Sequence, residues 1–167
     1  HVAIVLEGPA SLPLVMAARR AGVVLEVAPD HERVDELVAE ADIVLVHWWN
    51  HPGLRALLQR PLPPTRLVLW CHVLGLHPPQ VLTADATPSV DHVLLTSELS
   101  RASELAVAAE RSGVPVDVVP APFDVQRLSG FEPRPHDGVR IGYVGLVNDT
   151  KLHPGFAQLC AAVAAER

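Results

Sequence analysis

Six short apolar runs recur along the first part of the chain, and turn residues close each of them. Their hydrophobicity is continuous rather than alternating, which is typical of strands that are covered on both faces. The runs are Val2–Leu6, Val23–Val27, Ile43–Val46, Arg66–Trp70, His92–Thr96 and Val116–Val119. This recurrence constrains the fold more strongly than any other feature of the sequence.

Helical segments fill the intervals between these runs. They are Leu12–Ala21, Glu32–Ala41, the short Pro52–Gln59 and Ser97–Ser112, which ends at Gly113. Alternation of strands and helices at this spacing favours a parallel sheet with right-handed crossovers. We therefore predict an α/β fold, a Rossmann-like doubly wound parallel sheet.

The sequence pattern changes after Pro120, and we expect the domain boundary there. Gly130–Gly138 is rich in Pro and Gly and has no hydrophobic periodicity. We expect a domain over residues 1–128 and a linker over 129–138. Residues 139–167 then open a second unit with a strand, Val139–Val144, and a helix, Gly155–Arg167. No partner strands follow, so we expect this second unit to be incomplete.

Composition excludes several classes of protein. The net charge of −6 argues against a nucleic-acid partner, which usually requires a basic face. Two cysteines are too few for a disulfide framework and indicate a reducing compartment, so we expect a cytoplasmic protein. No apolar run is long enough to span a bilayer.

Ligands of open parallel sheets bind at the carboxyl ends of the strands. The first strand ends in a loop that contains Gly8 and Ser11, but it lacks the Gly-x-Gly-x-x-Gly pattern of a dinucleotide site. The loop could face an acceptor or serve only as a turn. The fifth strand is followed by Ser97, which we expect to cap a helix.

The third strand runs into His47, Trp48, Trp49, Asn50 and His51. Aromatic faces suit sugar rings and other flat apolar surfaces, although we expect at least one of the two indoles to be part of the core.

The fourth strand ends in Cys71-His72, and His77 follows in a long loop. A histidine at this position can act as a hydrogen-bond donor, a general base or a metal ligand. The spacing of the histidines matches no zinc pattern, so we predict no metal site, with a small metal-dependent hydrolase as an open alternative. Cys71 is a weak candidate nucleophile, and we expect Cys160 to lie in a helix core.

Five segments in the same order resemble the N-terminal domain of a GT-B fold, family 4 (group 1) glycosyltransferase. The segments are Asp42–Trp48, Leu67–His72, Val90–Arg101, Val118–Arg127 and Val139–Phe156. The resemblance implies transfer of a sugar from a nucleotide-diphosphate donor to an acceptor, with retention at the anomeric carbon and without a cofactor.

The resemblance also implies the roles of individual residues. His72 becomes the catalytic histidine near the transferred sugar, and Lys151 and Gly145 become donor-binding residues. Neutralising a leaving diphosphate gives a physical reason for the lysine. The implied acceptor-binding residues are Gly8, Ser11, His47, Trp48, Asn50 and His77.

Three features depart from the family pattern: Leu146 stands in place of an arginine, Ala121-Pro122 stands in place of Asn-Gly, and the paired-glutamate donor segment is absent. We expect the partners to be a nucleotide sugar, an acceptor that the sequence does not identify and a missing C-terminal domain, and we expect the isolated chain to be inactive. Peripheral membrane association of the full-length enzyme is compatible with this reading. The alternative is a non-catalytic sugar- or nucleotide-binding module on the same fold.

Overall fold

The computed structural model describes residues 1–122, 129–130, 132, 135, 137–138, 140–143 and 152–165. The chain divides into two compact units, residues 1–123 and residues 124–167. The first unit contains the alternating strands and helices, and the second contains the helix α5 (Phe156–Ala165).

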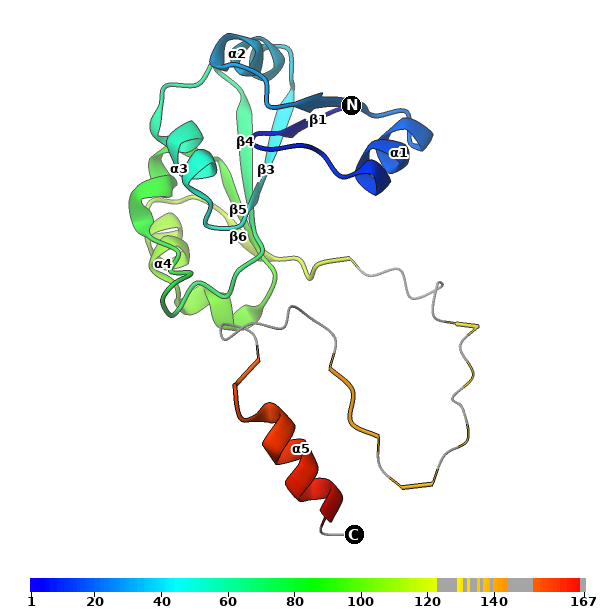
Figure 1. The fold of residues 1–167 in the computed structure, drawn as a ribbon. Helices are drawn as coiled ribbons and strands as arrows, with labels where there is room; N and C mark the ends of the chain where they lie inside the picture. Colours follow the sequence, from blue (N-terminus) through cyan, green and yellow to red (C-terminus); the bar gives the residue numbers. More distant parts are fainter. Residues whose placement is uncertain are drawn as a thin grey trace. The chain divides into compact units, whose positions relative to one another are not determined.

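The elements of the first unit follow the predicted runs closely (Figure 1). They are β1 (Val2–Val5), α1 (Leu12–Arg20), β2 (Val24–Val27), α2 (His31–Ala39), β3 (Ile43–Trp48), α3 (Pro52–Gln59), β4 (Arg66–Cys71), η1 (Ala84–Ser89), β5 (His92–Leu95), η2 (Glu98–Ala102), α4 (Glu104–Arg111) and β6 (Val116–Val118). The continuous helix expected over Ser97–Ser112 is wrong, because Ser103 is extended there. Its side chain accepts a hydrogen bond from the Ala106 amide and begins α4 after the short turn of η2.

The strands form two parallel sheets rather than one. A two-stranded sheet pairs β1 with β2, and a four-stranded sheet has the order β3-β4-β5-β6. The fold is therefore α/β with parallel sheets, consistent with a Rossmann-like arrangement, but the expected single sheet is interrupted between β1 and β3. On the described part of the chain, the outer edge of β3 has no strand partner.

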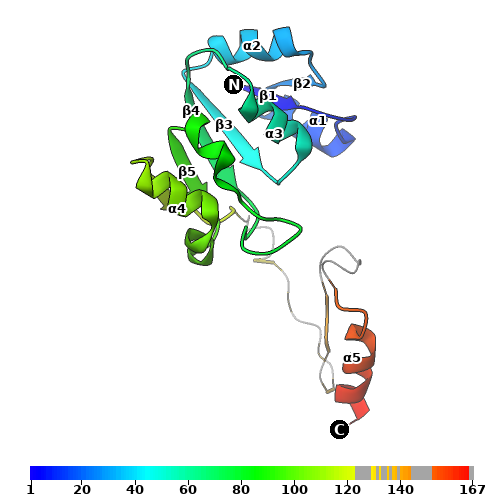
Figure 2. The ribbon, with the colours of Figure 1, turned by 90° about the vertical axis from the view of Figure 1, so that its left-hand side faces the viewer.

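The core lies on one face of the four-stranded sheet. Leu69 and Leu95 point to this face and are 0% exposed, and Leu58 of α3 and Leu105 of α4 pack against them. Figures 1 and 2 show α3 and α4 on the same side of the sheet. Burial of these aliphatic side chains is the main source of stability for the sheet.

The opposite face of the sheet is more open than a doubly wound fold predicts. Side chains alternate along β3, so Val46 and Trp48 enter the core while Ile43, Leu45 and His47 are exposed. Within the described residues, helices therefore cover one face of this sheet well and leave the β3 end of the other face accessible.

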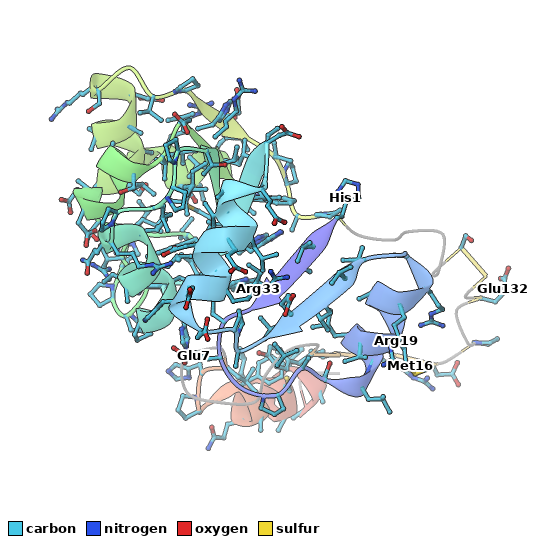
Figure 3. All side chains as sticks on the ribbon, turned by 90° about the horizontal axis from the view of Figure 1, so that it is seen from above. His1, Glu7, Met16, Arg19, Arg33 and Glu132 are labelled. Atoms are coloured by element: carbon cyan, nitrogen blue, oxygen red, sulfur yellow. The ribbon has the colours of Figure 1, made fainter. Side chains whose placement is uncertain are left out.

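An ion pair joins the two-stranded sheet to α2. Arg33 lies 2.9 Å from the Glu26 carboxylate of β2 and 2.9 Å from Glu36 of its own helix, and Figure 3 labels it. Helix α1 ends before Gly22, where a φ of +67° suits glycine.

In the second unit, α5 confirms a helix in the region predicted over Gly155–Arg167. It buries none of its residues, and Cys160 is partly exposed, so the expectation that Cys160 lies in a core is wrong. Of the strand expected over Val139–Val144, the described residues 140–143 carry no strand, and the two end residues lie outside the described part. No described helix has the length and hydrophobicity to cross a membrane.

Candidate functional site

The register of β3 and β4 places chemistry-bearing residues at their carboxyl ends. His47 is opposite Trp70, and Trp48 is opposite Cys71. Because side chains alternate along a strand, the first pair faces the open side of the sheet and the second faces the core. Residues that are adjacent in the sequence thus divide between the surface and the interior.

Four aromatic rings gather on the open side: His47, Trp49, Trp70 and His72, here called the ring cluster. The Nδ1 atom of His47 lies 2.8 Å from Nε2 of His72, and these rings are 5.0 Å apart with planes 7° from parallel. Trp49 stacks on His72 at 4.7 Å and 10°. Trp70 is tilted by 39° against both imidazoles, at 5.3 Å and 4.8 Å.

Trp70 is also fixed by the residue that follows β6, because its indole Nε1 donates a hydrogen bond to the Val119 carbonyl oxygen at 3.2 Å. This bond holds the indole across the ends of the strands. The ring cluster therefore rests on a polar anchor as well as on ring packing.

Burial and the charge of His47 together lower the pKa of His72. The His72 imidazole is thus neutral at neutral pH, with one nitrogen that donates and one that accepts. In the contact with His47, one ring donates and the other accepts, so a single proton lies between the two nitrogens. A neutral imidazole at a strand end can receive or deliver a proton at a substrate hydroxyl.

The loops after β3 and β4 are tied together by Asn50. Its backbone has a φ of +57°, a left-handed conformation that asparagine tolerates better than most residues. Its side-chain Nδ2 donates to the Pro79 carbonyl oxygen at 3.0 Å. The predicted residue Asn50 therefore has a positioning role beside the ring cluster.

The end of β1 approaches the start of α3. His51 caps this helix through Nδ1, which accepts from the Gly53 amide at 3.2 Å. Its Nε2 lies 3.5 Å from the carboxylate of Glu7, which Figure 3 labels. This contact brings the loop containing Gly8 to the same edge of the first unit as β3.

Trp48 departs from its predicted role as an acceptor-binding residue. It is 4% exposed and belongs to the core, as expected for one indole of the pair, so it does not reach a ligand on the surface. Trp49 and Trp70 take its place in the ring cluster. The alternation of side chains along the strand was the signal that could have separated Trp48 from its neighbours.

Other predicted residues lie apart from the ring cluster. Gly8 adopts a φ of +75°, and Ser11 precedes α1 without a side-chain capping bond. His77 is exposed, and its carbonyl oxygen accepts a hydrogen bond from the Gln80 amide in a turn. On the described residues, no hydrogen bond joins these three to the ring cluster. Gly145, Leu146 and Lys151 lie outside the described residues.

Cys71 is unsuited to nucleophilic chemistry, because burial raises the pKa of its thiol to about 12. Its side chain points to the core and away from His72. Within the described ranges, no group of three or more His, Cys, Asp or Glu side chains could hold a metal ion.

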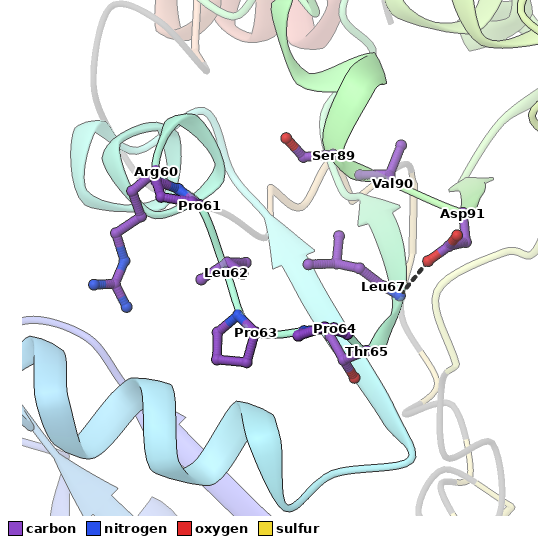
Figure 4. Close-up of a pocket in the computed structure, with 10 residues that line it drawn as sticks. All are labelled: Arg60, Pro61, Leu62, Pro63, Pro64, Thr65, Leu67, Ser89, Val90 and Asp91. Carbon is purple, nitrogen blue, oxygen red and sulfur yellow. Dashed lines mark hydrogen bonds between the residues drawn. The ribbon is translucent and has the colours of Figure 1, made fainter.

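A separate pocket of about 290 Å³ lies at the amino-terminal ends of β4 and β5 (Figure 4). The loop Arg60–Thr65 and the segment Ser89–Asp91 line it. Asp91 accepts a hydrogen bond from the Leu67 amide at 2.8 Å, and Arg60 is paired with Asp35. No sequence pattern predicts this pocket, and Asp91 and the terminal nitrogens of Arg60 already have partners.

Comparisons with protein-family models, with curated proteins and with solved structures find no match to this chain.

Proposed function

We propose that the chain supplies the acceptor-binding half of a GT-B glycosyltransferase, which transfers a sugar from a nucleotide-diphosphate donor to an acceptor with retention. The observation that carries this proposal is the ring cluster at the carboxyl ends of parallel strands, where such sheets bind ligands. The order of the five resembling segments along the sequence also supports it.

His72 is the catalytic residue of this proposal. Its lowered pKa keeps the imidazole neutral, so that it can hydrogen-bond a sugar hydroxyl without first losing a proton. The hydrogen bond with His47 fixes the orientation of the His72 ring. Lys151 and Gly145 would contact the donor diphosphate, whose developing charge a cation stabilises.

The test uses the protein encoded by the complete reading frame that contains this chain. It is incubated with a panel of nucleotide sugars and candidate acceptors, and release of nucleoside diphosphate and the mass of the product are measured. His72→Ala is expected to lower turnover by about 10²–10⁴-fold, the usual contribution of a proton-transferring side chain. Lys151→Ala is expected to lower turnover as well, because the donor loses its cation.

His31→Ala is the matched control, since His31 begins α2 and makes no contact with the ring cluster in the described residues. It should retain wild-type turnover. The absence of transfer from every donor, or full activity of His72→Ala, would contradict the proposal.

The second candidate is a non-catalytic sugar- or nucleotide-binding module. Two observations favour it: Trp49 is 58% exposed although it is a large aromatic residue, and Leu146 replaces the family arginine. Saturable binding of a nucleotide sugar by the complete protein, without formation of product, would select this module over the enzyme.

A further inference from the structure

The imidazoles of His47 and His72 meet edge to edge. Their nearest nitrogens are 2.8 Å apart, whereas stacked ring faces stay about 3.5 Å or more apart in van der Waals contact. The ring centroids are 5.0 Å apart, with planes 7° from parallel. This separation is nearly the largest that such a nitrogen contact allows, so both nitrogens lie close to the line between the ring centres. The contact is therefore an in-plane hydrogen bond between Nδ1 of His47 and Nε2 of His72.

The direction of this bond decides the tautomer of both rings, because each neutral imidazole has one donor and one acceptor nitrogen. If Nε2 of His72 donates, His47 carries its own proton on Nε2. If Nδ1 of His47 donates instead, both rings carry their protons on Nδ1. A neutral histidine side chain is more stable with its proton on Nε2. The first direction gives both rings this favoured form, and the second gives it to neither.

The surroundings of the pair do not oppose this direction. A carbonyl or carboxylate oxygen bonded to Nδ1 of His72 would hold a proton there. On the residues that the structure describes, the remaining nitrogens, Nδ1 of His72 and Nε2 of His47, make no hydrogen bond. Trp49 lies over the face of His72, whereas a hydroxyl group reaches Nδ1 in the plane of the imidazole, at its edge.

We infer that Nε2–H of His72 donates to Nδ1 of His47, and that His47 is a positioning residue that leaves Nδ1 of His72 as the hydrogen-bond acceptor of the site. A hydroxyl group of a ligand donates to this nitrogen. His47 thus acts on the ligand through His72, by fixing its tautomer. The role toward a ligand rests on the proposed function, whereas the direction of the bond does not.

The test of the direction is long-range proton–nitrogen NMR correlation on the isotope-labelled chain at about pH 8, where an ordinary imidazole is neutral. The expected spectrum has a proton on Nε2 of both rings and none on Nδ1 of either. It also shows a scalar coupling across the hydrogen bond between the two nitrogens. A proton on Nδ1 of His72, or the absence of this coupling, would overturn the inference.

Two variants of His47 separate its hydrogen bond from its bulk. His47→Asn keeps an acceptor oxygen at about the position of Nδ1, and His47→Leu keeps an apolar side chain without an acceptor. The Nε2 proton of His72 should exchange with water at least about fivefold faster in His47→Leu, because one hydrogen bond is lost. It should stay protected in His47→Asn. Equal exchange in the two variants would contradict the positioning role.

His31→Ala is again the control, because His31 begins α2 and makes no contact with the ring cluster in the described residues. The His72 signals should be unchanged in this variant. Circular dichroism should show that every variant is folded.

Turnover of the complete protein tests the consequence for a ligand. His47→Leu should lower it about tenfold, and His47→Asn should restore most of it, because only the asparagine retains an acceptor for His72. Full turnover of His47→Leu, or transfer by a protein whose His72 carries its proton on Nδ1, would end this inference and leave the proposed function standing. The expected tautomer, together with no transfer from any donor, would end the function and leave the direction of the bond standing.

Discussion

The Nδ1 atom of His47 lies 2.8 Å from the Nε2 atom of His72, so the ends of β3 and β4 carry one hydrogen-bonded imidazole pair. Only one of these rings can hold an additional proton without placing two positive charges in contact. On the described residues, the other rings packed against His72 are the uncharged indoles of Trp49 and Trp70.

Replacement of His47 tests this pairing. Burial and the charge of His47 lower the pKa of His72, so His47→Ala removes one cause and loosens the other. The pKa of His72 should therefore rise toward its ordinary value of 6.5, as measured by NMR titration of the imidazole resonances. His31→Ala should leave that titration unchanged, and an unchanged pKa in His47→Ala would contradict the pairing.

The same pKa shift predicts how stability depends on pH. The pKa of His72 lies below the ordinary value of 6.5 in the folded chain, so the unfolded chain binds more protons between the two values. The contribution of His72 to stability is present above 6.5 and is lost as pH falls through the folded pKa. Urea denaturation between neutral pH and about pH 5 measures this contribution. The free energy of unfolding should fall less with decreasing pH for His72→Asn than for the wild type.

The two cysteines should differ sharply toward thiol reagents. Burial raises the pKa of Cys71 to about 12 and hides its sulfur, whereas Cys160 on α5 is partly exposed. A colorimetric disulfide reagent at about pH 8 should therefore modify one thiol in the native chain and both in denaturant. Cys160→Ser should abolish the native reaction, and rapid modification of Cys71 would show that the core of the sheet opens readily.

Asn50 should tolerate glycine better than alanine. Both substitutions remove the hydrogen bond to Pro79, but only glycine adopts a φ of +57° without a steric penalty. Asn50→Ala is expected to be about 1 kcal/mol less stable than Asn50→Gly in chemical denaturation. Equal stabilities would mean that the left-handed conformation is not retained.

Core packing on the sheet gives a test of the fold itself. Leu69 is 0% exposed in the centre of β4, so Leu69→Ala should lower the free energy of unfolding by about 2–5 kcal/mol. Leu99 is 68% exposed, so Leu99→Ala should change it by no more than about 0.5 kcal/mol. A small effect at Leu69 would be inconsistent with the described core.

The strands were predictable because each is a local run of apolar residues, but the expected burial on both faces was wrong: burial alternates along β5, where Val93 and Leu95 are buried and Leu94 is partly exposed. The partners within the ring cluster were not predictable in the same way. His47 meets Trp70 only because Ile43 aligns with Arg66, and register depends on packing along whole strands.

The sequence predictions that were wrong also failed because of local competition or tertiary packing. Ser103 ends η2 and caps α4 through a local hydrogen bond that competed with the expected continuous helix. The separation of β1–β2 from β3 is a tertiary arrangement that apolar runs do not encode. His72 and His47 were identified as candidates because they follow the predicted strands. The contact of Trp49 with His72 could not be predicted, because the sequence does not show on which face of the sheet the Trp49 side chain lies.

Among the residues that the structure describes, no strand pairs with the outer edge of β3, and this has a consequence for how the protein behaves at high concentration. Ile43 and Leu45 are exposed along this edge, and neither a proline nor a lysine interrupts the strand. Backbone amides and carbonyls on such an edge form a template on which another extended chain can be added. A further strand can thus be added at β3. If that strand comes from the same molecule, the sheet is extended within one molecule, and if it comes from another copy, the molecules associate.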